Sequence, residues 1–293
     1  MSAPWESAQP VDEARAAALV GAQFPALRGA PVRAVATGWD NSVLLVGDVL
    51  FRFPRREVAV ELQRRELAVL PLLAELPLAV PRPTHLGAPA GDYPWPFWGG
   101  PLIPGSELAQ VACDRVAAAE AVGAFLHALH SLQVDVDLPM DPNSRGAPAD
   151  RAARTHDWLD RLAARGIWHR DAAVEAVVDV DLGTPTPDPV LVHGDLHPRH
   201  LLVLPDGSPT GVIDWGDTCF ADRAVDLSLA WSAFEGPARD AMLAAYGPVS
   251  ADTEARGRAL AVSLCAALAA WAADAGEAVL LEEYLAGIAR AAH

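Results

Sequence analysis

The amino-acid sequence predicts an α+β protein made of two parts, a small antiparallel sheet with flanking helices and a mostly helical remainder. Three observations predict this class. Strand-like and turn-like segments are concentrated in about the first hundred residues, and alanine- and leucine-rich helical segments dominate from Glu107 to the end. One strand-rich run over residues 189–226 interrupts those helices. A chain of 293 residues is long enough to form two lobes around a cleft.

The first part opens with a helix and three strands. Apolar residues recur at helical spacing over residues 11–27, and a Gly-Ala-Pro segment then breaks the pattern. Residues 32–36 and 42–53 are strand-like. Gly47-Asp48 divides the second of these segments and favours a tight hairpin. Three antiparallel strands are therefore expected here.

A second helix and the connection between the two parts follow. Residues 57–76 are rich in strong helix formers, and Pro71 is expected to kink or interrupt the last turns. The stretch 81–105 is dense in Pro, Gly and Trp, with a strand expected near residues 95–98. We expect an N-terminal nucleotide-binding lobe over residues 1–103, a hinge near 97–103, and a helical C-terminal lobe over 104–293 that carries the catalytic loop and the acceptor site.

The strand-rich run in the second part carries charged groups at the ends of its strands. It consists of an apolar strand (PVLVH), a polar loop (GDLHPR), a second strand (HLLVL), a turn (PDGS) and a third strand that ends at Asp214 (GVID). Asp195 comes just after the first strand, and Asp214 closes the hairpin nineteen residues later. This spacing can bring both carboxylates to one end of the hairpin, where one can act as a base and the other as a metal ligand.

Composition excludes several function classes. The formal net charge of −16 opposes nucleic-acid binding, so no nucleic-acid partner is expected. No uninterrupted apolar run approaches about 18 residues and no secretory signal is visible, which predicts a cytoplasmic protein without a membrane partner. The 3 cysteines are far apart, which argues against disulfides and a CxxC zinc site. All 22 basic residues are arginine, so any role usually filled by lysine falls to arginine. The sequence does not indicate an oligomeric state.

Three motifs together resemble one known family. VHGDLHPRHLLV, GVIDWGD and DRAVDLSLAW are similar to the aminoglycoside phosphotransferase family, whose fold is similar to that of protein kinases. His200, where the family pattern has asparagine, the IDW segment and the FRFPRR strand over residues 51–56 resemble its macrolide 2′-phosphotransferase branch, as does the C-terminal stretch. The resemblance covers most of the chain, strongly over residues 189–231 and weakly elsewhere. It implies a two-lobed, protein-kinase-like α+β fold.

The resemblance also implies a function. The chain is expected to move a phosphoryl group from ATP or GTP to a hydroxyl of a small molecule, an antibiotic with macrolides ahead of aminoglycosides, or a metabolite in a kinase of the same fold. Asp195 would be the catalytic base. His200 and Asp214 would hold the metal, Mg²⁺, with Mn²⁺ as the alternative because imidazole is a poor magnesium ligand.

Further residues follow from the same resemblance. Arg52 stands where the family has a lysine against the α- and β-phosphates, and Glu66 is its expected partner, with Glu57 and Glu61 competing. The turn over residues 37–42 is expected to cover the phosphates with backbone amides. The nucleotide-binding residues expected besides Arg52 and Glu66 are Asn41 and Ser42 in that turn and Trp98, Gly99 and Gly100 in the hinge, which reads the base through its backbone. The candidate acceptor-binding residues are Asp217, Trp231 and Trp271.

Two other functions compete with this interpretation. His193, Asp195, His197 and His200 form a dense set of zinc-type ligands, which permits a zinc-dependent hydrolase. The missing asparagine and lysine permit a catalytically silent nucleotide-binding protein. Against both, the kinase-like interpretation explains Arg52 and Asp214. Within that interpretation His193 packs and hydrogen-bonds the loop, Asp226 supports the catalytic loop, and His130 is a core histidine.

Overall fold

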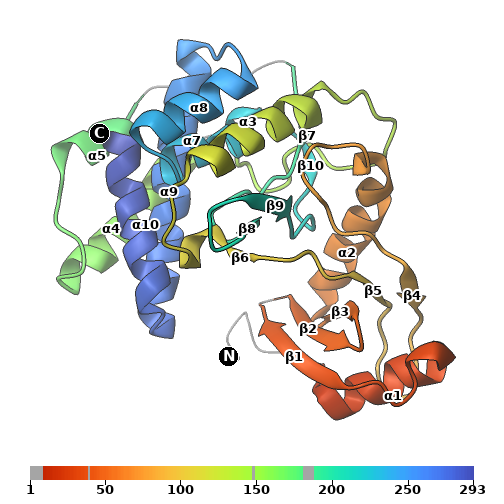
Figure 1. Cartoon of the computed structure of the whole chain (residues 1–293). Coiled ribbons are helices and arrows are strands. Elements are labelled where there is room, and N and C mark those ends of the chain that lie inside the picture. The colour runs from red at the N-terminus through yellow and green to blue at the C-terminus, as the bar shows by residue number, and fades with distance from the viewer. Residues whose placement is uncertain (1–8, 39, 147–148, 181–187) are drawn as a thin grey trace. The chain divides into compact units, whose positions relative to one another are not determined.

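The computed structural model describes residues 9–38, 40–146, 149–180 and 188–293 (Figure 1). The chain divides into two compact units. The N-terminal unit comprises Met1–Ala74, Val80–Ile103 and Trp215–Asp217. The C-terminal unit comprises Glu75–Ala79, Pro104–Asp214 and Thr218–His293. The α+β class predicted from the sequence is confirmed.

A 5-stranded antiparallel sheet forms the N-terminal unit, with the strand order β1-β2-β3-β5-β4 (Figure 1). Its strands are β1 (Val32–Thr37), β2 (Asn41–Val46), β3 (Val49–Pro54), β4 (His85–Gly87) and β5 (Phe97–Pro101). The hairpin expected at Gly47-Asp48 joins β2 to β3, and Gly47 has a φ of 64°, which favours glycine. The sequence predicts the first three strands but not that β5 pairs with both β3 and β4.

Helices flank this sheet at the positions that the sequence predicts. α1 (Glu13–Gln23) begins at Asp12, whose carboxylate accepts the Arg15 N–H at 2.8 Å as an N-cap. α2 (Glu57–Val69) ends earlier than its predicted boundary at residue 76. It continues as a 3₁₀ turn, η2 (Leu70–Leu73), because Pro71 supplies no N–H for the α-helical ladder.

Aromatic side chains fill the core under the sheet. Phe53 stacks on Phe97 with ring centroids 4.8 Å apart, and the Tyr93 hydroxyl donates to the Pro54 carbonyl at 2.7 Å. Gly99 in β5 makes room for this cluster, since a Cβ there would lie 2.6 Å from the Phe51 ring. The absence of a side chain at Gly99 therefore lets the Phe51 ring pack closely against β5.

The C-terminal unit contains two small antiparallel sheets with helices beside them (Figure 1). β7 (Val190–Val192) pairs with β10 (Cys219–Ala221), and a second sheet has the order β6-β8-β9. That sheet contains β6 (Ser106–Glu107), β8 (Leu201–Val203) and β9 (Pro209–Val212). The helices are α3 (Val116–Ser131), α4 (Ala149–Ala164), α5 (Ala172–Val178), α6 (Ala224–Leu227), α7 (Leu229–Ser232), α8 (Gly236–Tyr246), α9 (Ala251–Ala275) and α10 (Ala278–Ala292). The third strand predicted in the run 189–226 ends at Val212, two residues before Asp214.

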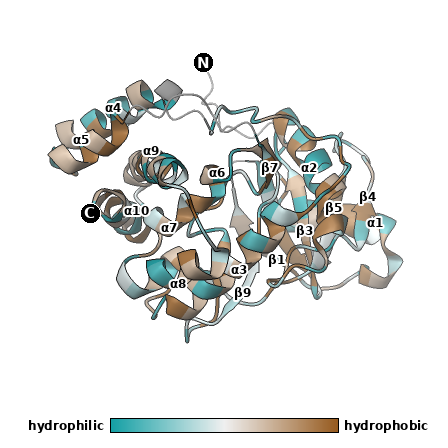
Figure 2. Ribbon diagram, turned by 90° about the horizontal axis from the view of Figure 1, so that it is seen from above, coloured by the Kyte–Doolittle hydropathy of each residue, from teal (hydrophilic) through white to brown (hydrophobic). Residues whose placement is uncertain are grey.

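α9 is the central helix of this unit. It packs on α10, α4, α6 and α7. Of the described helices, α9 alone is long and apolar enough to pass a test for a membrane span, and 50% of the tested window is buried within the protein. Burial of this extent is what a core helix of a globular fold shows. α4, by contrast, carries both hydrophilic and hydrophobic residues along its length (Figure 2).

The contact between α3 and α8 depends on one glycine, and replacing it tests the packing. A Cβ at Gly123 would lie 2.2 Å from the Met242 carbonyl oxygen, which belongs to the backbone and moves little. We expect Gly123→Ala to lower the free energy of unfolding by about 1–3 kcal/mol, measured by denaturant unfolding. Gly21→Ala in α1 is the matched control. Its Cβ would have no neighbour nearer than 3.7 Å, so a gain of about 0.5–1 kcal/mol is expected. Equal effects of the two substitutions would contradict this account.

Candidate active site

The loop between β7 and β8 is held in place by a buried, neutral histidine. The His193 Nε2 lies 2.9 Å from the Ile213 carbonyl oxygen, and its Nδ1 lies 3.3 Å from the Asp195 amide nitrogen. Because a carbonyl only accepts and an amide only donates, the ring is neutral with its proton on Nε2. Burial, together with the nearby His200, lowers the pKa of His193 from 6.5 to about 4. His193 therefore orders the loop and has neither ring nitrogen left for a metal.

The carboxylate of Asp226 holds the same loop through hydrogen bonds to its backbone. Asp226 accepts the His193 N–H at 2.7 Å and the Gly194 N–H at 3.0 Å, and it is completely buried. The His130 Nε2 lies 3.2 Å from this carboxylate, and the His130 Nδ1 lies 3.0 Å from the Tyr246 hydroxyl. Burial raises the pKa of Asp226, but the hydrogen bond from His130 and the charges around it outweigh burial and hold the pKa below 3.8. The group is thus an ionised anchor for the loop.

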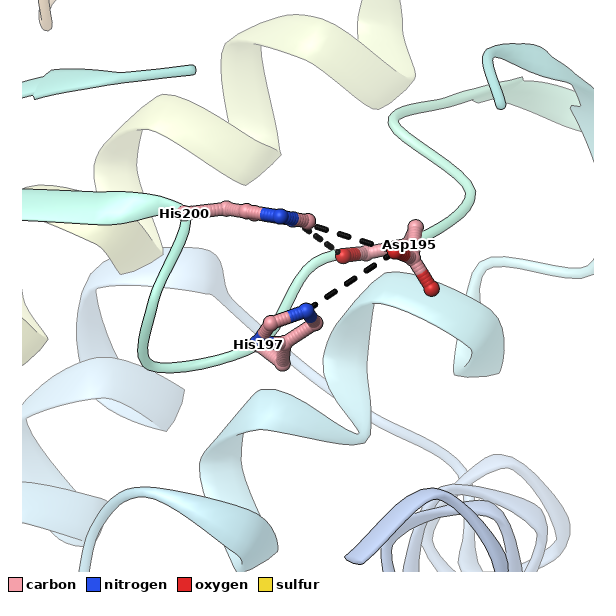
Figure 3. A group of neighbouring side chains, drawn as sticks. All are labelled: Asp195, His197 and His200. Carbon is pink, nitrogen blue, oxygen red and sulfur yellow. Dashed lines mark hydrogen bonds and ion pairs between the residues drawn. The ribbon is translucent and has the colours of Figure 1, made fainter. Parts of the chain in front are cut away.

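Asp195, His197 and His200 gather at the end of this loop (Figure 3). The Asp195 side chain is 25% exposed, with one oxygen 3.8 Å from His197 Nε2 and 3.9 Å from His200 Nδ1. The His200 Nδ1 also lies 2.8 Å from the Asp195 backbone oxygen. On its other side, the His200 Nε2 is 3.6 Å from the Asp214 carboxylate. His200 therefore connects the two carboxylates that the sequence predicts to converge.

The hydrogen bonds of His200 suit a metal ligand. Its Nδ1 must donate, since the Asp195 carbonyl only accepts, so in the neutral form of the ring the lone pair is on Nε2, the nitrogen that faces Asp214. Asp214 itself is 48% exposed and has a φ of 69°, a left-handed conformation that aspartate tolerates. The N–H of Ile213, the residue before Asp214, donates to the His200 carbonyl at 2.9 Å, and this hydrogen bond helps to hold Asp214 in position. Imidazole nitrogen and carboxylate oxygen fit a divalent cation, Mn²⁺ better than Mg²⁺.

The zinc-type cluster expected from the sequence is reduced to three residues. One possible ligand atom each from Asp195, His197 and His200 lies within 4.8 Å of the others. However, the His197 Nδ1 accepts the Arg199 N–H at 3.3 Å, which places the His197 proton on Nε2, the nitrogen that faces Asp195. Burial, with the charges of His200 and Arg199, holds the pKa of His197 well below 6.5. In this tautomer the nitrogen facing Asp195 is a donor and not a metal ligand.

Arg52 and Glu66 form the ion pair expected in the N-terminal unit. The Arg52 Nη1 lies 2.8 Å from an oxygen of Glu66, whose side chain is 2% exposed, and the same oxygen accepts the Trp215 N–H at 3.3 Å. The competing acid Glu61 instead pairs with Arg64 and Arg65 at the surface. The hydrogen bond from Arg64 lowers the pKa of Glu61 to about 2. Glu66 is thus the partner of Arg52, and Glu61 is not.

Asn41 and Ser42 are the first residues of β2 in this unit. Ser42 is 4% exposed and pairs with Phe53 of β3. The Asn41 Oδ1 is buried and has no hydrogen-bond partner among the residues that the structure describes. Trp39, in the turn predicted to cover the phosphates, lies outside the described residues.

The three residues expected in the hinge lie within β5. Trp98 and Gly99 pair with both neighbouring strands, and Gly100 pairs with Leu50 of β3. The backbone N–H and C=O groups of these three residues are therefore used in hydrogen bonds within the sheet. The first backbone groups past the end of the strand are those that follow Pro101. Trp98 is 3% exposed, and its ring lies 5.8 Å from the Arg52 guanidinium carbon, a cation–π contact. A Cβ at Gly100 would lie 2.0 Å from the Arg82 carbonyl oxygen, which explains the glycine.

The three candidate acceptor residues lie in different surroundings. Trp231 is 1% exposed and packs against Gly257 of α9, so it is a core residue and offers no surface to an acceptor. Trp271 is partly exposed and its ring lies 5.5 Å from the Arg199 guanidinium. Asp217 is partly exposed and belongs to the N-terminal unit.

Arg145 is a site residue that sequence reasoning missed. Its Nη2 lies 3.4 Å from a carboxylate oxygen of Asp195, and its Nη1 donates to the Gly194 carbonyl. Arg145 precedes Asp195 by fifty residues, and no spacing rule joins positions so far apart. The one available signal is the turn-rich DPNSRG segment, because loops often carry functional side chains.

The role of Asp226 as an anchor gives a first test of this site. Asparagine offers one oxygen and a donor amide in place of two acceptors, so at least one buried N–H of the loop would lose its partner. We expect Asp226→Asn to lower the free energy of unfolding by about 2–4 kcal/mol at neutral pH. Because the folded-state pKa of Asp226 lies below 3.8, this difference should shrink as the pH falls through that value. Denaturant unfolding between pH 7 and 3 measures both effects.

The control for this test is an exposed aspartate of α8. Asp240→Asn removes the same charge from the surface, and we expect a change within about 0.5 kcal/mol. An Asp226→Asn protein as stable as Asp240→Asn would contradict the anchor role.

Comparisons with known proteins bear on this geometry. Residues 31–260 match the model of the phosphotransferase enzyme family. An aminoglycoside 3′-phosphotransferase of Streptomyces fradiae is 32% identical over 155 residues, and one of Escherichia coli is 30% identical over 144 residues. The matches take in 48% and 47% of this chain and 56% and 52% of those proteins. The chain thus spans only about half the length of these curated relatives.

Solved structures extend the likeness to nearly the whole chain. A GDP complex of an aminoglycoside 2′-phosphotransferase superposes with a TM-score of 0.67 at 20% identity, covering 96% of this chain and 99% of that one. A macrolide 2′-phosphotransferase of Brachybacterium faecium gives a TM-score of 0.60 at 23% identity, covering 95% and 98%. These likenesses confirm the protein-kinase-like α+β fold. The match to the family model, which takes in most of the chain, shows that the protein belongs to the phosphotransferase enzyme family.

Proposed function

We propose that this protein is a phosphotransferase that moves the γ-phosphoryl group of a nucleoside triphosphate to a hydroxyl of a small molecule. One observation carries the proposal, namely that His200 lies between the carboxylates of Asp195 and Asp214 at the end of a rigidly held loop. Family membership supports it, as do solved relatives in complex with GDP and with ADP and spectinomycin. Such chemistry depends chiefly on positioning and charge neutralisation.

Asp195 is the proposed base. In the reaction the acceptor oxygen forms a bond to the γ-phosphorus, the bond from that phosphorus to the β–γ bridging oxygen breaks, and the nucleoside diphosphate leaves. The hydroxyl proton goes to the Asp195 carboxylate, which is partly exposed and can meet an acceptor. The Asp226 anchor and the neutral His193 keep that carboxylate in place.

His200 Nε2 and Asp214 would hold the divalent cation, which when bound neutralises charge on the phosphate oxygens. Arg52, kept in position by Glu66, is the proposed cation against the α- and β-phosphates. Asn41 and Ser42 are proposed to lie at the phosphates, while the base of ATP or GTP is proposed to meet the backbone beyond Pro101 rather than Trp98, Gly99 and Gly100. Charge neutralisation and a positioned nucleophile together are sufficient for phosphoryl transfer.

The acceptor is proposed to be an antibiotic, with macrolides ahead of aminoglycosides, or a metabolite. The ranking rests on His200 and on the resemblance of the C-terminal stretch, while relatives named for both antibiotic classes support an antibiotic acceptor without ranking the two. Asp217 and Trp271 remain the proposed acceptor contacts. A cytoplasmic location is proposed with this function.

A zinc-dependent hydrolase is the second candidate, because one possible ligand atom each of Asp195, His197 and His200 lies within 4.8 Å of the others, although His197 would first have to change its tautomer. It predicts stoichiometric zinc in the purified protein, measured by mass spectrometry, and product formation without nucleotide. The phosphotransferase predicts neither.

The decisive experiment is incubation with ATP or GTP, Mg²⁺ or Mn²⁺, and a panel of macrolides, aminoglycosides and hydroxylated metabolites. Mass spectrometry should show an acceptor that gains one phosphoryl group. We expect Asp195→Asn to lower kcat by about 10²- to 10⁴-fold with little change in nucleotide affinity. Asp206→Asn, in the exposed turn between β8 and β9, is the charge-matched control and should keep normal turnover. Full activity of Asp195→Asn would remove Asp195 as the base.

The metal preference should follow residue 200. An amide oxygen suits Mg²⁺ better than an imidazole does, so we expect His200→Asn to raise the ratio of kcat/KM with Mg²⁺ to that with Mn²⁺ by about tenfold or more. Steady-state kinetics in the two metals measure the ratio. His169→Asn, far along the chain from the loop, is the matched control and should leave the ratio unchanged. An unchanged ratio in His200→Asn would mean that residue 200 does not hold the metal.

A further inference from the structure

Arg145 contacts two successive residues of the loop between β7 and β8. Its Nη1 donates to the Gly194 carbonyl, and its Nη2 lies 3.4 Å from Oδ1 of Asp195. Both nitrogens belong to one planar guanidinium, so the carbonyl and the carboxylate are held at a fixed spacing. We call these two contacts the Arg145 clamp. The clamp joins the backbone of the loop to the side chain of the proposed base.

The two carboxylate oxygens of Asp195 have different surroundings (Figure 3). Oδ1 faces Arg145, whereas Oδ2 lies 3.8 Å from His197 Nε2 and 3.9 Å from His200 Nδ1. Both of these distances are too long for hydrogen bonds, so neither histidine occupies a lone pair of Oδ2. The other ring nitrogen of His200 lies 3.6 Å from Asp214. The carboxylate therefore has one oxygen at the guanidinium and the other on the side of the proposed metal ligands.

The loop that carries Arg145 is built around Asp141. The Asp141 carboxylate accepts the Arg145 N–H and the Gly146 N–H, both at 2.7 Å. Asp141 and Ser144 have φ values of 32° and 49°, in the left-handed region that is unfavourable for residues other than glycine. The two hydrogen bonds offset part of this cost and fix the backbone at Arg145.

The same loop is attached to the sheet from which the loop of Asp195 begins. The Asp141 N–H donates to the Phe220 carbonyl at 2.9 Å, and the Phe220 N–H donates to the Pro139 carbonyl at 3.0 Å. Phe220 lies in β10, which pairs with β7, and β7 ends two residues before Gly194. Both partners of the clamp are therefore held on one small sheet, and backbone hydrogen bonds set their relative positions.

We propose that Arg145 is the positioning residue of Asp195, holding Oδ1 so that Oδ2 faces the acceptor and takes its hydroxyl proton. This role rests on the proposed function. The acceptor oxygen must approach the γ-phosphorus beside His200 and Asp214, which is the side that Oδ2 faces.

The clamp leaves the chemistry of the transfer step to Asp195. The hydroxyl proton passes to Oδ2, the acceptor oxygen forms its bond to the γ-phosphorus, and the nucleoside diphosphate leaves with the electron pair of the broken P–O bond. Arg145 neither gives nor takes a proton in this step, because a guanidinium stays charged. Its contribution is the orientation of the carboxylate, and an error of about 1 Å in such an orientation can cost about 100-fold in rate.

Steady-state kinetics test this role. Arg145→Ala lets the Asp195 carboxylate turn, so we expect kcat for phosphoryl transfer to fall about 10- to 100-fold, with KM for the nucleotide within about twofold of the wild type. Arg145→Lys keeps the charge but loses the planar pair of donors, so its kcat should also stay low. Arg161→Ala, which removes an exposed arginine of α4, is the matched control and should keep normal kcat. A wild-type kcat in either Arg145 variant would overturn the proposal.

Chemical rescue separates positioning from a loss of folding. Free guanidinium ion can enter the space that Arg145→Ala vacates, and at concentrations too low to unfold the protein it should raise kcat of this variant several-fold. It should raise kcat of neither the wild type nor Asp195→Asn. Thermal unfolding of Arg145→Ala is measured alongside. A lower Tm combined with no response to guanidinium would make Arg145 a structural residue and overturn the proposal.

Nuclear magnetic resonance tests the clamp without any turnover. Labelling glycine carbonyls with ¹³C and aspartate nitrogens with ¹⁵N selects the Gly-Asp pairs, which occur at residues 47–48, 91–92, 194–195 and 216–217. Arg145→Ala should shift the signal of the pair 194–195, because the Gly194 carbonyl loses its donor, and Arg161→Ala should leave it unchanged. An unchanged signal in Arg145→Ala would mean that the clamp is absent and would overturn the proposal. A wild-type protein that transfers no phosphoryl group would instead contradict the proposed function, and the shifted signal would still establish the clamp.

Discussion

The loop that carries the proposed catalytic residues keeps its shape because one buried carboxylate accepts hydrogen bonds from two successive backbone amides. Asp226 receives the N–H groups of His193 and Gly194, and Gly194 has a φ of 87°, which lets the chain turn sharply after β7. A buried ion of this kind is tolerable only when it is well hydrogen-bonded, and His130 adds a third partner. Asp195 and His200 are thereby positioned by residues that take no part in the reaction themselves.

Local signals explain which parts of the structure the sequence predicts. The hairpin at Gly47-Asp48 and the end of α2 before Pro71 are set by residues within a few positions, whereas the pairing of β3 with β5 joins positions far apart and leaves no local trace. Local signals also explain which site residues could be predicted.

Asp195 and Asp214 lie within one short supersecondary unit, so their approach to His200 could be predicted. Arg145 lies in a loop fifty residues before Asp195, so no local signal joins the two. Trp231 lies in an apolar stretch of sequence that fits a ligand pocket and a protein core equally well, and the structure buries it in the core.

Arginine side chains also stabilise the framework of the C-terminal unit. Arg258 donates to the last carbonyls of α10, those of Ala291 and Ala292, and Arg290 donates to the Ser232 carbonyl at the end of α7. A planar guanidinium can bond two acceptors at once, so it satisfies the carbonyls that helix ends leave open.

The left-handed backbone at Asp214 limits how this protein can change over evolutionary time. At a φ of 69°, valine and isoleucine are strongly disfavoured, while asparagine and glycine fit without strain. The replacements that the backbone accepts most easily therefore include ones that remove the carboxylate proposed to bind the metal and leave the fold intact. If the proposed role of Asp214 holds, a lineage of such chains can lose activity through one tolerated substitution and persist as a folded, inactive protein.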